Sequence, residues 1–306
     1  MTGPVLSVED LHLAIVSRRE TIPILRGVSL DVQPGEVHGL VGESGAGKTM
    51  IGKVVLGIQP PKARITQGKV RFLGKDITHL RERARRHLMG LGLGLIPQDP
   101  MTSLNPAYQI GKQITDVLRL HLGMDRAAAN ARALELLNDV HIRAPERVLM
   151  QYPHELSGGM RQRVLIAIAF ACRPKLIIAD EPTTALDVTV QRQVLALIKE
   201  MQEHEGASIL FVTHDLGVVA KVCDRVTVLH AGRVLEQGET AQIVASPDHA
   251  YTQALMNATP RYDRPGDLLQ PVPDALTDHL NAEALNYDQA HRSAFGRGAA
   301  GAQSGA

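Results

Sequence analysis

The sequence predicts an α/β fold built on a parallel sheet, and three apolar runs carry that prediction. EVHGLVG at 36–42, KLIIADEP at 175–182 and ILFVTHD at 209–215 each contain a continuous apolar stretch, as expected of strands buried on both faces. Each run ends in glycine or polar residues. Because open α/β sheets place their ligands at the carboxyl ends of such strands, we expect the functional residues at these three points.

Composition and charge narrow the class of protein. The chain has 306 residues, enough to bury a substantial core as one large domain or two. Its 33 basic and 32 acidic side chains argue against general nucleic-acid binding. The longest apolar run, VLIAIAFAC at 164–172, is shorter than the roughly 20 residues that span a bilayer. With no signal-peptide pattern and two cysteines expected to be reduced thiols, we expect a soluble intracellular protein.

The first strand leads into a glycine-rich loop, GESGAGKT at 42–49, and then into a helical stretch, IGKVVLGI at 51–58. The glycines let the backbone curl so that several N–H groups face one anion, and the helix adds its positive end. A chance glycine-rich turn is the alternative, but it does not explain the lysine, the threonine and both flanking elements. We expect Lys48 to reach the β- and γ-phosphates and Thr49 to ligate Mg²⁺. The residues expected at the phosphates are Gly42, Glu43, Ser44, Gly45, Ala46, Gly47, Lys48 and Thr49.

Two carboxylates follow the second strand, LIIA at 176–179. We expect Asp180 to hold Mg²⁺ through its water shell and Glu181 to polarise an attacking water, an arrangement typical of hydrolases. The alternative is a solvated Asp-Glu pair with no chemical role.

Two further polar side chains follow strands. His214 ends the third run, where it can contact the γ-phosphate and hold Glu181 and the water in line; the alternative is a structural histidine. Gln98 follows GLGLIP at 92–97, and its amide can reach Mg²⁺ and the water.

A second serine-glycine-glycine turn, LSGGMRQR at 156–163, opens another helical stretch. Taken with GESGAGKT, Gln98, LIIADE, the ALD at 185–187 and His214, it resembles the ABC-type ATPases over about residues 5–260. An ordinary serine cap followed by a flexible turn is the alternative for this segment. The resemblance implies a P-loop NTPase fold of the ABC type: a RecA-like parallel-sheet core, an antiparallel β subdomain, a helical subdomain and a short C-terminal extension.

The same resemblance explains the second turn. In this family two nucleotide-binding domains pack head to tail, and each ATP lies between the P-loop of one and the signature of the other. A helix start with a serine hydroxyl and unpaired N–H groups suits a γ-phosphate held by a partner. Asp187 would lie at that interface. The residues this assigns to the partner's nucleotide are Ser157, Gly158, Gly159, Met160, Gln162 and Asp187.

The expected organisation follows the motifs. Residues 5–35 and 63–80 read as an antiparallel platform, and 5–245 as the ATPase domain with a helical subdomain at about 100–160. Residues 246–285 are expected to form the C-terminal extension, and 286–306, which are rich in small residues, a disordered tail. The family's adenine-stacking aromatic has no counterpart in AIVSRRETIPIL at 14–25, where Arg18 or Arg19 could stack instead.

Several stretches resemble the oligopeptide/dipeptide/nickel importer branch: IPQDPMTSLNP at 96–106, YPHELSGGMRQR at 152–163, ADEPTTALDVTVQ at 179–191 and AYTQALMNATP at 250–260. That implies an ATP-hydrolysing subunit of a membrane importer, peripheral on the cytoplasmic face of the plasma membrane and using ATP and Mg²⁺. Expected partners are a second ATPase subunit (a relative or a copy), two permease subunits and, indirectly, an extracytoplasmic binding protein, with no nucleic acid. No cysteine follows Cys223, so no iron–sulfur cluster is expected.

One alternative function stays open at this point: a soluble ABC-type ATPase that is not coupled to transport. Such proteins usually carry two cassettes or a long coiled coil, whereas this chain has one cassette.

Overall fold

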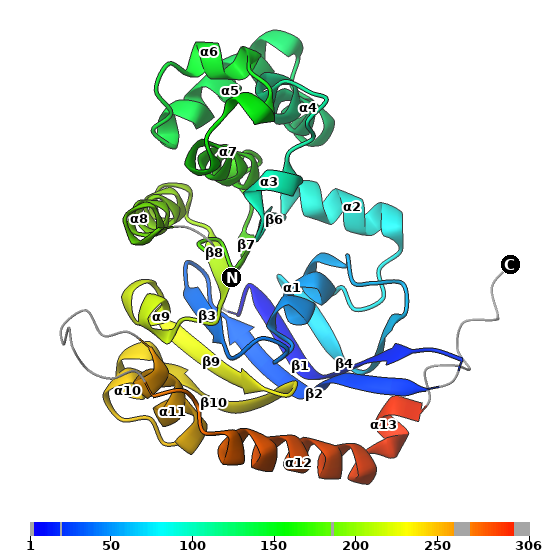
Figure 1. Ribbon diagram of the computed structural model, residues 1–306. Helices are drawn as coiled ribbons and strands as arrows, with labels where there is room; N and C mark the ends of the chain where they lie inside the picture. Colours follow the sequence, from blue (N-terminus) through cyan, green and yellow to red (C-terminus); the bar gives the residue numbers. More distant parts are fainter. Residues whose placement is uncertain (1–2, 19, 185–186, 260–269, 297–306) are drawn as a thin grey trace, which may run out of the picture. The chain divides into compact units, whose positions relative to one another are not determined.

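The computed structural model describes residues 3–18, 20–184, 187–259 and 270–296. The chain divides into two compact units (Figure 1). Unit 1 comprises residues 1–80 and 211–306, and unit 2 comprises residues 81–210. Strand β8 (Ser208–Thr213) carries the chain from unit 2 into unit 1.

Unit 1 contains an antiparallel sheet in the order β2-β1-β4-β5. Its strands are β1 (Leu6–Val16), β2 (Thr21–Val32), β4 (Ala63–Phe72) and β5 (Lys75–Asp76). The register between β1 and β4 shifts after Glu9, and Gly68 lies at that bulge with φ +91°. A Cβ at residue 68 would collide with the backbone of Asp10, so only glycine fits. The expected antiparallel platform is confirmed.

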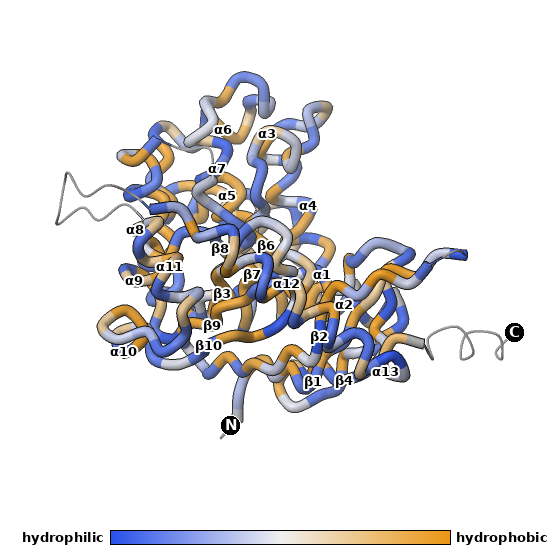
Figure 2. The backbone as a smooth tube through the Cα atoms, turned by 60° about the horizontal axis from the view of Figure 1, so that its bottom comes forward, coloured by the Kyte–Doolittle hydropathy of each residue, from blue (hydrophilic) through white to orange (hydrophobic). Residues whose placement is uncertain are grey.

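The second sheet of unit 1 runs β10-β9-β3-β8. Strands β9 (Arg225–His230) and β3 (Val37–Val41) are parallel, and β10 (Arg233–Glu239) is antiparallel to β9. All five residues of β3 are buried, as expected of a strand covered on both faces, and His38 is the one among them with a polar side chain. Strands β3, β8 and β9 of this sheet carry mostly the hydrophobic colour in Figure 2. The helices of unit 1 are α1 (Lys48–Leu56), α9 (Leu216–Val222), α10 (Thr240–Ala245), α11 (Ala250–Ala258), α12 (Asp274–Ala290) and α13 (Arg292–Gly296).

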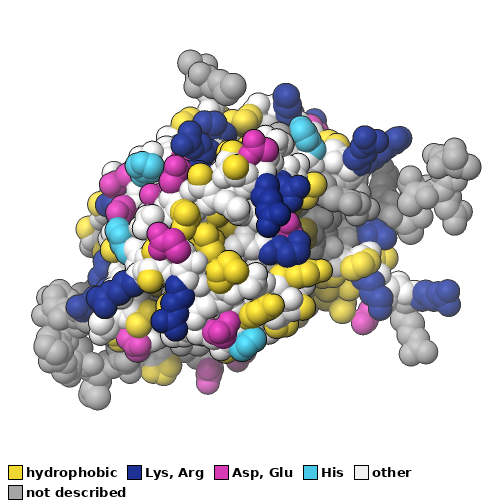
Figure 3. Space-filling view, turned by 90° about the horizontal axis from the view of Figure 1, so that it is seen from above, with side chains coloured by type: hydrophobic (Ala, Val, Ile, Leu, Met, Phe, Trp, Pro, Cys, Tyr) yellow, Lys and Arg dark blue, Asp and Glu magenta, His cyan; other side chains and the backbone are white. Residues whose placement is uncertain are grey.

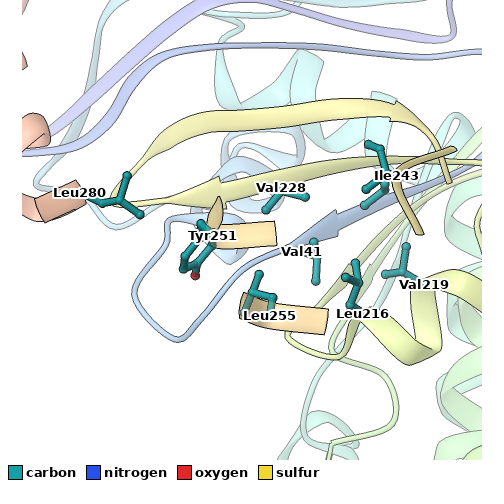
Figure 4. Packing of buried hydrophobic residues seen from close by; sticks show 9 residues of the cluster. Val41, Leu216, Val219, Val228, Ile243, Tyr251, Leu255 and Leu280 are labelled. Atoms are coloured by element: carbon teal, nitrogen blue, oxygen red, sulfur yellow. The ribbon is translucent and has the colours of Figure 1, made fainter. Parts of the chain in front are cut away.

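A hydrophobic cluster joins this sheet to the helices that follow it (Figure 4). Val41 and Val228 come from the sheet, Tyr251 and Leu255 from α11, and Leu280 from α12. Burying one such side chain contributes roughly 1.5–3 kcal/mol. The helices after β10 are therefore part of the core of unit 1.

The boundary expected at residue 286 is corrected by the structure. Helix α12 continues to Ala290, and α13 follows it. The physical reason is packing against the N-terminal strands: the Tyr287 hydroxyl lies 2.9 Å from Nε2 of His12, and the ring of Phe295 packs edge-on against His12. Residues 297–306 of the expected tail lie outside the described residues.

Unit 2 contains the parallel pair β6 (Leu93–Ile96) and β7 (Leu176–Asp180), with β7 next to the first residues of β8. Gly94 of β6 allows helix α7 (Gly158–Phe170) to pack closely on the strand, because a Cβ there would lie 2.7 Å from the carbonyl oxygen of Ala169. The helices of unit 2 are α2 (Glu82–Leu91), α3 (Pro100–Ser103), α4 (Ile110–Leu122), α5 (Arg126–Asp139), α6 (Pro145–Met150), the 3₁₀ helix η1 (Pro153–Glu155), α7 (Gly158–Phe170) and α8 (Val188–Glu205).

The helical part of unit 2 follows its sequence pattern. Ile110, Ile114 and Leu118 recur at helical spacing along α4 and are fully buried. Asp125 caps α5 by accepting from the N–H of Ala128 at 2.8 Å. Of the helices that the structure describes in either unit, none combines the length and the hydrophobicity that crossing a membrane requires.

Candidate active site

The glycine-rich loop of unit 1 leaves the buried strand β3 and ends where α1 begins. Gly47 precedes the helix in the left-handed region, at φ +98°. Gly42 is packed so closely that a Cβ would collide with the carbonyl oxygen of Leu229. At Gly45, by contrast, a Cβ would meet no atom within 4 Å. The loop is thus fixed at both ends and open at its middle.

Lys48 lies inside this loop and is 4% exposed. Its Nζ donates to the carbonyl oxygens of Gly42 at 2.6 Å and Glu43 at 2.9 Å. A buried ammonium beside the first N–H groups of a helix suits a phosphate, since both present positive charge. Thr49, the next residue, is half-buried and brings a hydroxyl oxygen, a ligand type that Mg²⁺ accepts. The residues present therefore fit a nucleotide phosphate with its metal.

Glu43 also contacts a residue far along the chain. The hydroxyl of Tyr251 lies 3.2 Å from both the backbone nitrogen and Oε2 of Glu43. Burial raises the pKa of Tyr251, and the nearby Glu43 carboxylate adds to the rise, so the phenol stays protonated at neutral pH. Sequence reasoning missed this residue, and its only signal was its place in the YTQALM segment.

In unit 2, the two expected carboxylates stand at the end of β7. Asp180 is its last residue and is half-buried. Glu181 follows with φ +45°, an uncommon backbone conformation for a residue with a side chain. Its Oε2 accepts hydrogen bonds from Thr184 Oγ1 at 2.8 Å and from Gln98 Nε2 at 3.2 Å. The structure thus brings Gln98 and Glu181 together, and it adds Thr184, which sequence reasoning missed.

Gln98 is followed directly by the capped start of α3. Asp99 caps α3, accepting from the N–H of Met101 and the hydroxyl of Thr102, each at 2.7 Å. These hydrogen bonds lower the pKa of the Asp99 carboxyl below its ordinary value. Gln98 itself is exposed.

The serine-glycine-glycine turn opens α7 in unit 2. Ser157 is exposed and caps the helix, accepting from the N–H of Met160 at 3.3 Å. A Cβ on Gly158 would meet no atom within 4 Å, and one on Gly159 only a side chain at 3.7 Å. The guanidinium of Arg161 donates to the carbonyl oxygen of Leu156, and this hydrogen bond stabilises the turn. The turn is therefore an exposed helix start with open space above its glycines.

The structure gives Gln162 a position that does not suit its expected contact with a nucleotide. Its side chain is fully buried, and Nε2 donates to the carbonyl oxygen of Pro182 at 2.9 Å. We therefore assign Gln162 to supporting the turn after β7 and remove it from the nucleotide-contacting set, because a wholly buried amide cannot meet a ligand from another molecule.

The remaining expected residues are placed as follows. Asp187 is exposed and caps α8, with Oδ1 accepting from the N–H groups of Thr189 and Val190. Ala185 and Leu186 of the ALD stretch lie outside the described residues. In unit 1, His214 is exposed directly after β8. Arg18 is exposed beyond the end of β1, and Arg19 lies outside the described residues.

Comparison with known protein families gives two matches. Residues 25–184 match the family model described as ABC transporter, and residues 235–284 match the model described as the oligopeptide/dipeptide transporter C-terminal region. The second match covers most of β10, all of α10 and α11, and part of α12.

The curated relatives of this chain are named as transport ATP-binding proteins. The chain is 44% identical to a probable D,D-dipeptide transport ATP-binding protein of Escherichia coli, over 90% of this chain and 84% of the relative. It is 46% identical to an oligopeptide transport ATP-binding protein of Bacillus subtilis, over 90% and 78%. It is 50% identical to a peptidoglycan transport ATP-binding protein of Agrobacterium fabrum over 89% of this chain, and it spans half the length of that relative.

Two solved structures have a fold similar to that of this chain. A dimeric ATP-binding cassette in a post-hydrolysis state bound to ADP and Pi matches with a TM-score of 0.68 at 26% identity, covering 77% of this chain and 98% of that one. The cbiO1 protein of Clostridium perfringens, part of an ABC transporter complex, matches with a TM-score of 0.69 at 27% identity, covering 80% and 92%.

Proposed function

The chain belongs to the ABC transporter family of ATP-hydrolysing subunits, and from that premise we propose that it powers the uptake of peptides or a related small solute. The observation that carries this proposal is the presence, in one chain, of the Lys48 phosphate loop and of a C-terminal region matching that of oligopeptide/dipeptide transporters. The alternative of an ATPase that is not coupled to transport is disfavoured, because the relatives described above are named as transport proteins.

We assign the catalytic and binding residues as the sequence predicted, except that Gln162 is removed from the nucleotide-contacting set. The loop at residues 42–49 holds the phosphates through its N–H groups and Lys48. Magnesium, when bound, neutralises charge on the phosphates; Thr49, Asp180 and Gln98 are the residues that would hold it. Because Nε2 of Gln98 donates to Glu181, Oε1 is the atom that Gln98 can offer to a metal ion.

Glu181 is assigned the role of general base. Its Oε2 accepts hydrogen bonds from Thr184 and Gln98, which orient the carboxylate, and a carboxylate held in this way can take a proton from water. His214 is assigned to the γ-phosphate. Nothing in these assignments requires a group beyond ATP, Mg²⁺ and the chain's own residues.

The exposed turn at Ser157 supports a site shared by two molecules. Gly158 and Gly159 leave space above the start of α7, where a phosphate carried by a second ATPase subunit can approach. ATP bound in this way favours a closed pair, and hydrolysis removes that preference. We propose that Ser157, Gly158, Gly159, Met160 and Asp187 contribute to this shared site.

We further propose that unit 2 contacts membrane permease subunits, which would hold the chain at the cytoplasmic face of the plasma membrane. Exposed hydrophobic side chains support this: Met101, Tyr108 and Met150 are 57%, 47% and 65% exposed. Figure 3 looks onto the helices of unit 2 and shows hydrophobic side chains lying among charged ones. Such exposed apolar groups mark contact surfaces when they gather on one part of a protein.

The test is reconstitution with the companion subunits. The chain is co-purified with its permeases, inserted into vesicles, and assayed for ATP-dependent uptake of radiolabelled di- and oligopeptides. We expect uptake with the wild-type chain and none with Lys48→Ala. ATP hydrolysis by a chain that never co-purifies with membrane subunits would overturn the transport role while leaving the ATPase assignment intact.

A further inference from the structure

Glu43 of the phosphate loop is bound at three of its atoms by two other residues. Its N–H donates to the Tyr251 hydroxyl, and that hydroxyl donates to its Oε2, both at 3.2 Å. Its carbonyl oxygen accepts from Lys48 Nζ at 2.9 Å. One phenol from residue 251 therefore fixes the same loop residue whose carbonyl positions the loop lysine.

Tyr251 is itself rigidly placed. Its side chain is fully buried within the hydrophobic cluster shown in Figure 4. Its N–H donates to Nδ1 of His249, which caps α11, at 3.0 Å. The carboxylate of Glu236 accepts from the N–H of Asp248 at 2.9 Å and from that of His249 at 3.2 Å, and so ties the start of α11 to β10. The phenol has little freedom to move away from the loop.

A second contact extends the arrangement to α12. The ring of His230 packs edge-on against Tyr251 with centroids 4.9 Å apart. Nε2 of His230 lies 3.1 Å from Oδ1 of Asn281 on α12. His230 ends β9, and Leu229 beside it restricts Gly42. The end of β9 and α11 thus contact the first residues of the loop, and α12 contacts the end of β9 through Asn281 and His230.

We propose that Tyr251 is a positioning residue for the phosphate loop, so that the C-terminal region at residues 235–284 helps to set this chain's affinity for nucleotide. The inference rests on the proposed role of residues 42–49 in holding the phosphates. A loop whose backbone is already held in one conformation binds a phosphate with a smaller loss of conformational entropy. Without the phenol, Glu43 and the carbonyl that Lys48 bonds gain freedom, and binding weakens.

Replacing Tyr251 with Phe in the full-length chain tests this proposal. Affinity is measured by titration with a fluorescent ATP analogue, and folding by circular dichroism. We expect affinity to fall about three- to tenfold, the factor associated with one hydrogen bond. In the ATPase assay KM should rise while kcat changes less than about twofold, because the reacting groups are untouched.

Tyr287→Phe is the matched control. It removes a phenol hydroxyl from the same C-terminal part of the chain, but one that bonds His12 and not the loop. We expect it to leave nucleotide affinity unchanged. Equal weakening by both variants would mean a general loss of folding and would overturn the proposal.

A double-mutant cycle separates positioning through Glu43 from other effects. Tyr251→Phe should cost less affinity in a Glu43→Ala background, where one of its two partners is already absent. Strict additivity would overturn the route through Glu43. Lys48→Ala serves as the reference. If it loses binding while Tyr251→Phe binds normally, only this inference fails; if Lys48→Ala binds normally, the proposed function fails.

Discussion

The hydroxyl of Thr184 donates to Oε2 of Glu181 at 2.8 Å, and the Thr184 N–H donates to the carbonyl oxygen of the same glutamate at 3.1 Å. Both bonds close a short turn after β7, in which Glu181 adopts φ +45°. An uncommon backbone conformation persists only where the surroundings hold it. Thr184 supplies that support and at the same time orients the carboxylate.

Thr184→Val is expected to lower ATP turnover about three- to tenfold, because it keeps the shape of the side chain and removes the hydroxyl that orients Glu181. Nucleotide affinity should stay within about twofold, as the loop at 42–49 is unchanged. Thr184→Ser restores a hydroxyl and should recover most of the turnover. Full activity in Thr184→Val would show that the Thr184 hydroxyl is not needed to orient the carboxylate.

Glu181→Gln is expected to reduce turnover by roughly 10²–10⁴ while ATP binding is retained, because the amide cannot accept a proton from water. The paired form of the ATPase should accumulate in ATP, since the step that opens it is blocked. Light scattering with and without ATP, beside a steady-state assay, measures both effects. Unchanged hydrolysis would remove Glu181 from the role of general base.

Ser157→Arg is expected to abolish ATP-induced pairing and hydrolysis by blocking the open space above the start of α7. Binding of ATP to the single subunit should persist, because the residues assigned to the phosphates within one subunit, 42–49, are unchanged. Equilibrium titration and analytical ultracentrifugation distinguish the two properties. A variant that hydrolyses ATP normally with its partner would contradict the shared site.

Gly232→Ala is expected to destabilise the chain far more than Gly35→Ala, although both glycines have φ +73°. Alanine at a positive φ costs about 1 kcal/mol at either position. A Cβ at residue 232 would also collide with the carbonyl oxygen of Ile24, whereas at residue 35 it would meet nothing within 4 Å. Denaturant unfolding should therefore show a loss of about 2–4 kcal/mol for the first variant. Similar losses for both would refute the close approach of β2 to this turn.

Stability should depend on pH through the buried pair Glu36 and His38, whose Oε1 and Nδ1 atoms lie 2.8 Å apart. Burial alone would raise the pKa of Glu36, but hydrogen bonds from His38 and from the N–H of Gln33 bring it below its ordinary value of 4.5. A lowered folded pKa stabilises the chain above pH 4.5, and that stability is lost as the pH falls through the folded value. Glu36→Gln should therefore lower Tm at pH 7 and have a smaller effect near pH 3. An equal effect at both pH values would contradict the pairing.

Much of the fold and most of the site were predictable because they depend on local patterns. Buried runs such as LIIA predict strands; Asp180 and Glu181 lie at the end of that strand, and Lys48 follows β3 after the glycine-rich loop. Contacts between distant residues leave no such pattern. Tyr251 acts on a residue 208 positions away, and nothing in YTQALM specifies its partner. The expectation of a disordered tail from residue 286 was wrong for the described residues 286–296, because Tyr287 and Asp288 bond His12 and Arg26, which lie more than 250 positions earlier.

The pairing of α12 with the first strands has a consequence for synthesis on the ribosome. Arg26 is held by both oxygens of Asp288, at 2.7 and 2.8 Å, and His12 by Tyr287. Strands β1 and β2 therefore emerge more than 250 residues ahead of the side chains that complete their packing. Translation of unit 2 is complete at residue 210. Unit 2 can therefore fold before the ribosome has made the C-terminal residues that pack against β1 and β2 of unit 1.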